Sequence, residues 1–424
     1  MDIRITPAAL NGRLAAITSK SDAHRALICA ALCDGVTDVV IHDVNRDINA
    51  TAGCLSALGA VITHPTEEIF RVEGIKSVPE APLLDCGESG STLRFMLPVA
   101  AAIAKNAAVT GSGRLPERPL SPLMEEMEQK GCSFSNRQLP LTLSGGLKPG
   151  VYTLPGNVSS QYVTGLLLAL PFMDGDSEII LTSRLESIGY VNMTLRTLSK
   201  FGVSVEEFPN GGGYRVKGGQ RCISPGTITA EGDWSNAAFW VAAAAMGGEI
   251  ELFGIDMQSL QGDKAILDLA SQFGAKVTKS GDEVKTSAAP MNGIEIDAGN
   301  IPDIVPELAL MACAAKGDTV IKNAARLRIK ESDRLSTVAQ MITSFGGDIE
   351  ELADGLIIHG TGSLKGGITD SFNDHRIAMA AAIASVICKE DVIITNAQAV
   401  EKSYPKFFEH FNKLGGKADV IRNG

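Results

Sequence analysis

The chain of 424 residues repeats one pattern six times, and this repeat restricts its fold more than any other feature. In each copy a glycine follows an amphipathic stretch and precedes a short run typical of a strand. The glycines lie 69 to 72 residues apart, at Gly59, Gly131, Gly202, Gly274, Gly346 and Gly415. Self-similarity at a fixed period indicates repeated supersecondary units that stack on one another.

Each copy predicts two helices of different character. In residues 265–273 apolar side chains recur at helical spacing, and Gly274 then supplies a left-handed cap. The other helix is apolar nearly all round, so we expect it to be buried. Its copies begin near Asp22, Gly90, Ser160, Ser235, Ile304 and His375. Each unit therefore reads strand, buried helix, strand, amphipathic helix and one or two further strands, and three units per half predict two similar α/β domains.

Composition excludes several classes of protein. Lysine and arginine number 38 against 49 aspartates and glutamates, a formal charge of −11, so we expect neither a nucleic-acid nor a membrane partner. The longest apolar run, Ile377 to Cys388, is too short to span a membrane. The eight cysteines form no C-x-x-C pair and the N-terminus has no signal-peptide pattern, which favours a cytoplasmic protein.

Other chemistries lack their motifs. The six histidines show no H-x-x-x-H or H-E-x-x-H spacing, so no metal site is expected. The chain contains no G-x-x-x-x-G-K-[ST] phosphate loop, no complete dinucleotide fingerprint and no G-x-S-x-G elbow. We therefore expect no cofactor.

Polar residues gather where the buried helices begin. Asp233, Ser235 and Asp374 are interpreted as helix caps, because their side chains can accept from free backbone N–H groups. Cations at the same places oppose the helix dipole, and they make sense if an anion binds there. These cations are Lys20, Arg25, Arg94 and Arg376. Charged loops at residues 111–119, 326–335 and 401–405 add to them, so the sequence predicts a polyanion site inside an acidic protein.

Several of these segments together resemble the 5-enolpyruvylshikimate-3-phosphate synthase family, in order over essentially the whole chain. They are Ser19-Lys20-Ser21 with Arg25, Glu117-Arg118-Pro119, Asn157-Val158-Ser159-Ser160-Gln161, Ile301-Pro302-Asp303, Lys330-Glu331-Ser332-Asp333-Arg334, Asn373-Asp374-His375-Arg376, and Lys402 before Tyr404-Pro405. The resemblance implies an inside-out α/β barrel with buried helices, made of two domains of three βαβαββ repeats each. It implies domains of residues 20–227 and of 1–19 with 228–424, with the active site in the cleft between them.

The resemblance also implies a reaction: transfer of the enolpyruvyl group of phosphoenolpyruvate to the 5-hydroxyl of shikimate 3-phosphate, with release of phosphate, in the shikimate pathway of chorismate and aromatic amino acid biosynthesis. By the family pattern, shikimate 3-phosphate is held by Lys20, Ser21, Arg25, Ser159, Ser160, Gln161, Ser187, Asp303 and Lys330. Phosphoenolpyruvate is held by Lys20, Gly90, Arg118, Gln161, Arg334, Arg376 and Lys402. We expect the chain to act as a monomer on these two small molecules.

Catalysis needs one proton removed from the hydroxyl and one delivered to the methylene carbon. The resemblance assigns hydroxyl deprotonation to Asp303, with Lys20 beside it, and methylene protonation to Glu331. Two positions depart from the family pattern near Gly90: Glu88 adds a carboxylate and Phe95 replaces a proline.

Two alternatives remain at this point. A UDP-N-acetylglucosamine enolpyruvyl transferase shares the fold but typically carries a reactive cysteine on a loop of the first domain, whereas residues 111–119 contain none. A non-catalytic anion-binding protein of the same fold needs the cations but no general base.

Overall fold

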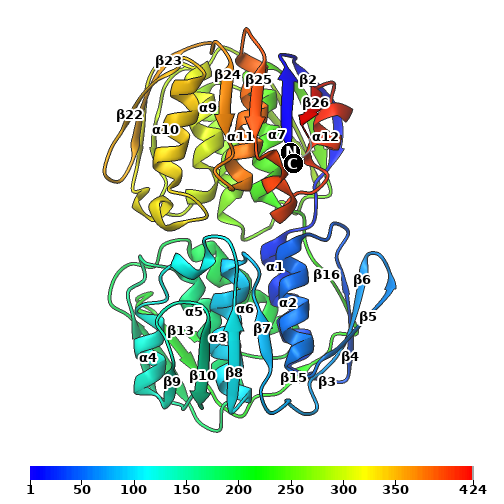
Figure 1. Ribbon diagram of the computed structural model, residues 1–424, viewed down its shortest axis with the longest axis vertical. Helices are drawn as coiled ribbons and strands as arrows, with labels where there is room; N and C mark the ends of the chain where they lie inside the picture. The colour runs from blue at the N-terminus through cyan, green and yellow to red at the C-terminus, as the bar shows by residue number, and fades with distance from the viewer. Residues whose placement is uncertain (423–424) are drawn as a thin grey trace. The chain divides into compact units, whose positions relative to one another are not determined.

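The computed structural model describes residues 1–422, which divide into two compact units (Figure 1). Within this range, unit 1 is Met1–Ile17 with residues 231–422, and unit 2 is Thr18–Ala230. These crossings lie within three residues of the domain boundaries stated above. The last two residues of the predicted second domain lie outside the described range.

Unit 2 contains three four-stranded sheets of one topology. In each, the first two strands are parallel and the others are antiparallel. The strand orders are β16 (Thr227–Thr229), β4 (Val36–Val40), β6 (Ile69–Glu73), β5 (Val61–Thr66); β7 (Leu83–Asp85), β8 (Asn106–Thr110), β10 (Leu141–Gly145), β9 (Cys132–Phe134); and β11 (Val151–Leu154), β12 (Ser177–Leu181), β14 (Gly213–Val216), β13 (Glu206–Glu207). A short parallel pair joins β15 (Cys222–Ile223) to β3 (Cys33–Asp34).

Unit 1 has three sheets of the same order. They are β2 (Leu10–Ala15), β17 (Gly248–Phe253), β19 (Glu283–Ser287), β18 (Lys276–Ser280); β20 (Glu295–Asp297), β21 (Lys316–Lys322), β23 (Leu356–Thr361), β22 (Asp348–Glu351); and β24 (Gly367–Asp370), β25 (Val392–Thr395), β1 (Asp2–Thr6), β26 (Lys417–Arg422). In the last sheet β1 takes the place that the closing strand of a repeat holds elsewhere. The first strand β1 and the last described strand β26 therefore lie side by side in unit 1 (Figure 1).

In residues 1–422, six α-helices form the cores of the two units, and six others are only partly buried. The core helices, buried almost throughout, are α1 (Lys20–Ala31), α3 (Gly90–Ile103), α5 (Ser160–Ala169), α7 (Trp234–Gly247), α9 (Val305–Ala314) and α11 (His375–Ala384). The outer helices are α2 (Arg46–Ala57), α4 (Leu123–Gln129), α6 (Ile188–Lys200), α8 (Ile266–Phe273), α10 (Arg334–Ser344) and α12 (Phe407–Lys413). The predicted mixed α/β fold of βαβαββ units with buried helices is confirmed. None of the helices in residues 1–422 is both long and apolar enough to cross a membrane.

Serine and aspartate side chains cap most core helices, as the sequence predicted. Asp233 accepts from Asn236 N at 2.8 Å at the start of α7, and Asp374 accepts from Arg376 N at 2.9 Å at the start of α11. Ser235 is not a cap, and that interpretation was wrong. It lies inside the first turn of α7, where its hydroxyl donates to the buried Asp263 carboxylate.

Aromatic packing anchors α7 to the C-terminal segment of unit 1. The buried Trp240 ring stacks on Phe407 with centroids 5.0 Å apart, and its Nε1 donates to the Tyr404 hydroxyl at 3.2 Å. This hydroxyl also shares a hydrogen bond of 2.7 Å with His410 Nδ1. The contact holds the chain that follows Lys402 against the core.

Replacing this indole tests the packing. Trp240→Ala is expected to lower the free energy of unfolding by about 3–5 kcal/mol, because it leaves a large cavity and removes the hydrogen bond to the Tyr404 hydroxyl. Ile368→Ala on β24, whose side chain is 62% exposed, serves as the control and should cost less than about 0.5 kcal/mol. Urea titrations measure both, and equal losses would contradict the packing argument.

Candidate active site

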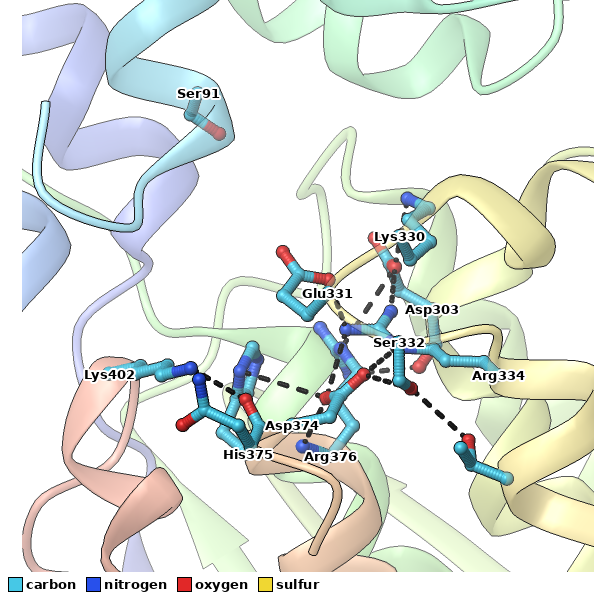
Figure 2. Close-up of polar contacts among 12 residues, drawn as sticks. Ser91, Asp303, Lys330, Glu331, Ser332, Arg334, Asp374, His375, Arg376 and Lys402 are labelled. Carbon is cyan, nitrogen blue, oxygen red and sulfur yellow. Dashed lines mark hydrogen bonds and ion pairs between the residues drawn. The ribbon is translucent and has the colours of Figure 1, made fainter. Parts of the chain in front are cut away.

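A buried arginine organises the polar cluster of unit 1 (Figure 2). Arg334 begins α10, and its side chain is only 1% exposed. Its Nε donates to Asp374 at 2.8 Å, Nη1 to Asp303 at 2.9 Å, and Nη2 to Glu331 at 2.6 Å. The three carboxylates come from three separate segments. This one guanidinium therefore links η4 (Pro302–Ile304), the loop before α10 and the start of α11.

Asp303 receives two more cations. Lys330 Nζ, which follows η5 (Ala325–Ile329), donates to Asp303 Oδ1 at 3.1 Å. Arg376 on α11 lies with its Nε 3.9 Å from the same oxygen and donates Nη1 to the Asp303 carbonyl at 2.9 Å. One carboxylate therefore lies among three cationic side chains.

The electrostatics follow from this crowding. Burial disfavours the Asp303 carboxylate, but Lys330, Arg376 and Arg334 outweigh burial and hold its pKa far below the ordinary value. Burial likewise opposes the charge on Arg334, and Asp374, Glu331 and Asp303 overcome it and raise the pKa of Arg334. Burial lowers the pKa of Lys330 more than Asp303 raises it. The cluster is thus ionised at neutral pH around Asp303 and Arg334.

The Lys402 side chain contacts a strained turn at Phe372 and Asn373. Lys402 ends η7 (Ala397–Lys402), and its Nζ donates to the Asn373 carbonyl at 2.6 Å (Figure 2). Phe372 and Asn373 both have left-handed backbones, with φ of 54° and 53°. Asp370 Oδ1 accepts from Phe372 N at 2.6 Å and so supports this conformation. Strain of this kind persists only where the surroundings enforce it. Here the strained backbone orients the Asn373 carbonyl toward Lys402 Nζ.

In unit 2 the predicted residues also lie at helix starts. Lys20 is the first residue of α1, and its Nζ donates to Asp47 Oδ2 at 2.7 Å in the first turn of α2. Thr92 of α3 donates its hydroxyl to the Asp47 carbonyl at 3.4 Å. Three helix N-termini therefore meet around this lysine.

Gly90 lies against two guanidinium groups. A Cβ at Gly90 would come within 2.6 Å of Arg118 Nη1 and 2.9 Å of Arg94 Nη1. Arg94 donates to Gln161 Oε1 at 2.8 Å, and Gln161 donates Nε2 to the Ser91 hydroxyl at 2.9 Å. The structure thus brings together Gly90, Arg118 and Gln161, which the sequence predicted, with Arg94, which it named only as a cation.

Arg25 is engaged mainly inside the protein. Its Nε donates to Thr194 at 2.8 Å, Nη1 to the Ser21 carbonyl at 2.5 Å, and Nη2 to the Tyr190 carbonyl at 2.8 Å. The same guanidinium lies 5.0 Å from the centroid of the Phe95 ring, the aromatic residue that departs from the family pattern. Arg25 therefore joins α1, α3 and α6 whatever else it binds.

The remaining predicted serines lie at two helix starts. Ser159 caps α5 by accepting from Gln161 N at 3.3 Å, and Ser160 is the first residue of that helix. Ser187 has a left-handed φ of 53° and precedes α6 directly. A serine in this conformation is constrained by its surroundings rather than by its own preference.

Sequence reasoning missed two carboxylates. Asp47 was not singled out. Its place in the first turn of one helix, close in sequence to the helix start that carries Lys20, could have indicated an ion pair between them. Glu307 was not assigned a role either, and nothing local in the sequence indicates its burial. Asp374 was interpreted as a cap alone, whereas it also binds Arg334.

No metal centre is visible in residues 1–422: no three His, Cys, Asp or Glu side chains are grouped so that they could hold an ion. All eight cysteines are free and buried.

Comparisons with known proteins agree along the whole chain. The EPSP synthase (3-phosphoshikimate 1-carboxyvinyltransferase) family profile matches residues 5–411. The 3-phosphoshikimate 1-carboxyvinyltransferase of Clostridium novyi is 45% identical, covering 99% of this chain and 98% of its own length, and that of Clostridioides difficile is 40% identical, covering 100% and 99%. The EPSP synthase of Acinetobacter baumannii superposes with a TM-score of 0.82 at 26% identity over 99% of this chain and 100% of its own.

A more distant structure shows how widely the fold extends. The enolpyruvyl transferase NikO of Streptomyces tendae superposes with a TM-score of 0.81 at 18% identity, covering 99% and 98% of the two chains. Fold and relatives together define a transferase of the enolpyruvyl type. The chain belongs to the EPSP synthase (3-phosphoshikimate 1-carboxyvinyltransferase) family. The family and the transferase class predicted from the sequence are thereby confirmed.

Asp374→Asn tests the dependence of unit 1 on its buried cation. Asparagine keeps the helix cap but removes the charge facing Arg334, so we expect a loss of about 3 kcal/mol in the free energy of unfolding at pH 7. Burial opposes ionisation of Asp374, but Arg334 outweighs it and lowers the pKa below the ordinary 3.8. The stabilisation is therefore complete above about pH 4 and is lost as the pH falls further, so the difference between variant and wild type should shrink in acid.

Asp333→Asn is the matched control. Asp333 caps α10 and bonds Arg328 at 2.9 Å, but its side chain is 37% exposed, so its loss should cost less than about 1 kcal/mol. Urea titrations between pH 3 and pH 7 measure both variants. A pH-independent loss in Asp374→Asn would show that the charge pair is not its cause.

Proposed function

We propose that this chain transfers the enolpyruvyl group of phosphoenolpyruvate to the 5-hydroxyl of shikimate 3-phosphate and releases phosphate. The observation that carries the proposal beyond family membership is the Asp303 cluster, where one ionised carboxylate lies among Lys330, Arg334 and Arg376. Such a group offers a base for a hydroxyl and cations for phosphate and carboxylate in the same place. The two substrates carry two phosphates and two carboxylates.

The proposed ligands for shikimate 3-phosphate come from both units. Unit 2 contributes the helix-start residues Lys20, Ser21, Arg25, Ser159, Ser160, Gln161 and Ser187. Unit 1 contributes Asp303 and Lys330. Free N–H groups at helix N-termini favour phosphate, which supports this assignment. Because Arg25 is largely satisfied by the protein, its contribution is charge rather than a new set of hydrogen bonds.

The proposed ligands for phosphoenolpyruvate are chiefly guanidinium and ammonium groups. They are Lys20, Gly90, Arg118 and Gln161 of unit 2, and Arg334, Arg376 and Lys402 of unit 1. Gly90 acts by leaving room for Arg118 and Arg94. Paired cations of this kind are already ordered by their protein partners, so little side-chain entropy is lost when the substrate binds.

Asp303 is the proposed base for the hydroxyl. In the free protein its depressed pKa makes it a weak base. Bound substrate anions offset the charges of Arg334 and Arg376, and this raises the basicity of Asp303 when the hydroxyl is present. Lys20 is the proposed catalytic partner from unit 2.

Glu331 is the proposed acid that protonates the methylene carbon. Its carboxylate accepts from Arg334 at 2.6 Å, a contact that favours the ionised form. The proton it delivers must therefore be taken up as the substrate anions bind. The hydroxyl oxygen then bonds to the carbon that bears the phosphate, which gives a tetrahedral intermediate. This intermediate loses phosphate, and the ionised Glu331 takes back a proton from the new methyl group, so the carbon–carbon double bond is restored in the product.

The all-buried free cysteines fit a reducing compartment, and we propose that the chain acts as a cytoplasmic monomer. They also disfavour the UDP-N-acetylglucosamine transferase, whose reactive cysteine on a loop has no counterpart here.

Phosphate release from phosphoenolpyruvate, in chelator-treated buffer, tests the reaction directly. Release only with shikimate 3-phosphate is the expected result. Release only with UDP-N-acetylglucosamine would replace the proposed acceptor. If no phosphate is released with either acceptor, the proposed reaction is wrong, and the non-catalytic anion-binding protein is the interpretation that stays.

Gly90→Ala is expected to raise the KM for phosphoenolpyruvate about tenfold, because the added methyl displaces Arg118 and Arg94. The KM for shikimate 3-phosphate should change less than about twofold, since Arg118 is assigned to phosphoenolpyruvate alone and Arg94 to neither substrate. Gly53→Ala on α2, where a Cβ meets nothing within 4 Å, is the control and should leave both constants unchanged. Equal effects on both KM values would contradict the assignment.

Asp303→Asn is expected to lower kcat at least about 100-fold while calorimetry still detects shikimate 3-phosphate binding, since the amide keeps the shape but cannot accept the proton. Asp297→Asn, at the exposed end of β20, is the control and should change kcat less than about twofold. Normal turnover in Asp303→Asn would remove the base assignment.

A further inference from the structure

Glu307 is a buried carboxyl that the proposed mechanism does not use. It lies in the first turn of α9, four residues after Asp303, and its side chain is 0% exposed. Neither carboxyl oxygen has a hydrogen-bond partner among the described residues. A buried carboxylate without hydrogen bonds is costly. Glu307 must therefore either pair with a cation or hold a proton and stay neutral.

The nearest cation is a proposed substrate ligand. Glu307 Oε1 lies 3.8 Å from Arg376 Nη1, the atom that already donates to the Asp303 carbonyl at 2.9 Å. The contact is therefore an ion pair at the limit of reach rather than a hydrogen bond. In residues 1–422 the Arg376 guanidinium therefore contacts Glu307 on the one hand and Asp303 on the other.

The surrounding charges are already balanced without Glu307. Lys330, Arg334 and Arg376 face Asp303, Glu331 and Asp374 in the same cluster. The charged groups that face Glu307 are Arg376 on α11, Arg334 on α10 and Asp263 on η3 (Gly262–Ala265). Burial and the negative charge of Asp263 together raise the pKa of Glu307 to about 8, against the opposing effects of Arg376 and Arg334. At neutral pH the carboxyl therefore holds a proton.

We propose that Glu307 is a positioning residue which, while neutral, leaves the charge of Arg376 available to phosphoenolpyruvate and, once ionised, withdraws that charge from the substrate. The proposal rests on the assignment of Arg376 to phosphoenolpyruvate. Glu307 touches no substrate and acts only through this arginine.

The sign of the pH dependence follows from linkage. Bound phosphoenolpyruvate brings negative charge to Arg376, which favours the neutral form of Glu307, so the complex binds this proton more tightly than the free protein does. Affinity is therefore full while Glu307 is neutral and falls as the pH rises past about 8. A one-unit difference between the two states corresponds to about a tenfold change in affinity.

The test is the KM for phosphoenolpyruvate between pH 7 and pH 9.5, at saturating shikimate 3-phosphate. In the wild type KM should rise about tenfold across this range. Glu307→Gln mimics the neutral carboxyl, so its KM should stay near the low-pH value throughout and kcat at pH 7 should be close to wild type. A side chain that merely fills space would leave the wild-type pH profile in place.

A second variant moves the profile instead of removing it. Asp263→Asn deletes the negative charge that favours neutral Glu307, so the rise in KM should begin at lower pH than in the wild type. Glu409→Gln in the first turn of α12 is the control for the loss of one glutamate and should keep the wild-type profile.

The outcomes separate the two proposals. An inactive wild type would overturn the proposed reaction. An active wild type with the same rise in KM in Glu307→Gln, and no displacement in Asp263→Asn, would overturn the role of Glu307 while leaving the reaction intact. A flat profile in Glu307→Gln together with the displaced profile in Asp263→Asn would establish it.

Discussion

The cluster of unit 1 depends on the pairing of buried Arg334 with three carboxylates. Removing a guanidinium from water is expensive, and only closely placed, hydrogen-bonded anions offset that cost. Asp374 caps one core helix, Asp303 precedes another, and Glu331 lies three residues before Arg334 itself. Satisfying one cation thus fixes three chain segments, and these segments carry Lys330, Arg376 and the turn that meets Lys402.

The same solution recurs in unit 2 with other residues. Lys20 meets Asp47, Arg94 meets Gln161, and Arg25 meets carbonyls and hydroxyls of α1 and α6. Each cation is held by a polar group of a neighbouring helix or turn, so its position is set before any anion arrives. Pre-ordered cations reduce the entropy lost on binding, and a local balance of charge lets an acidic protein keep a polyanion site. Glu307 differs, because its charge is not needed for this balance.

Much of the fold was predictable from local patterns. The glycine period predicted six repeated units, and the absence of a polar face on residues 237–246 predicted a buried helix. Pairing between distant strands was not visible in those patterns: β1 completes the last sheet beside β25 and β26, and β16 pairs with β4 almost 190 residues earlier. Ser235 was misread for a related reason, since a cap and a first-turn serine differ by two positions and the choice depends on Asp263, 28 residues away.

The sequence by itself determined the period, the burial of the core helices and the kinds of residue gathered at their starts, because helix spacing, capping and apolar runs are local properties. Family motifs added the expected chemistry. Only the tertiary structure decided which carboxylate neutralises which cation and that Asp47 faces Lys20. It also decided that Glu307 is buried 3.8 Å from Arg376, with no hydrogen-bond partner for its carboxyl group in residues 1–422. These facts depend on contacts between segments far apart in the chain and on exclusion of water, and the energy of a charge is set by both.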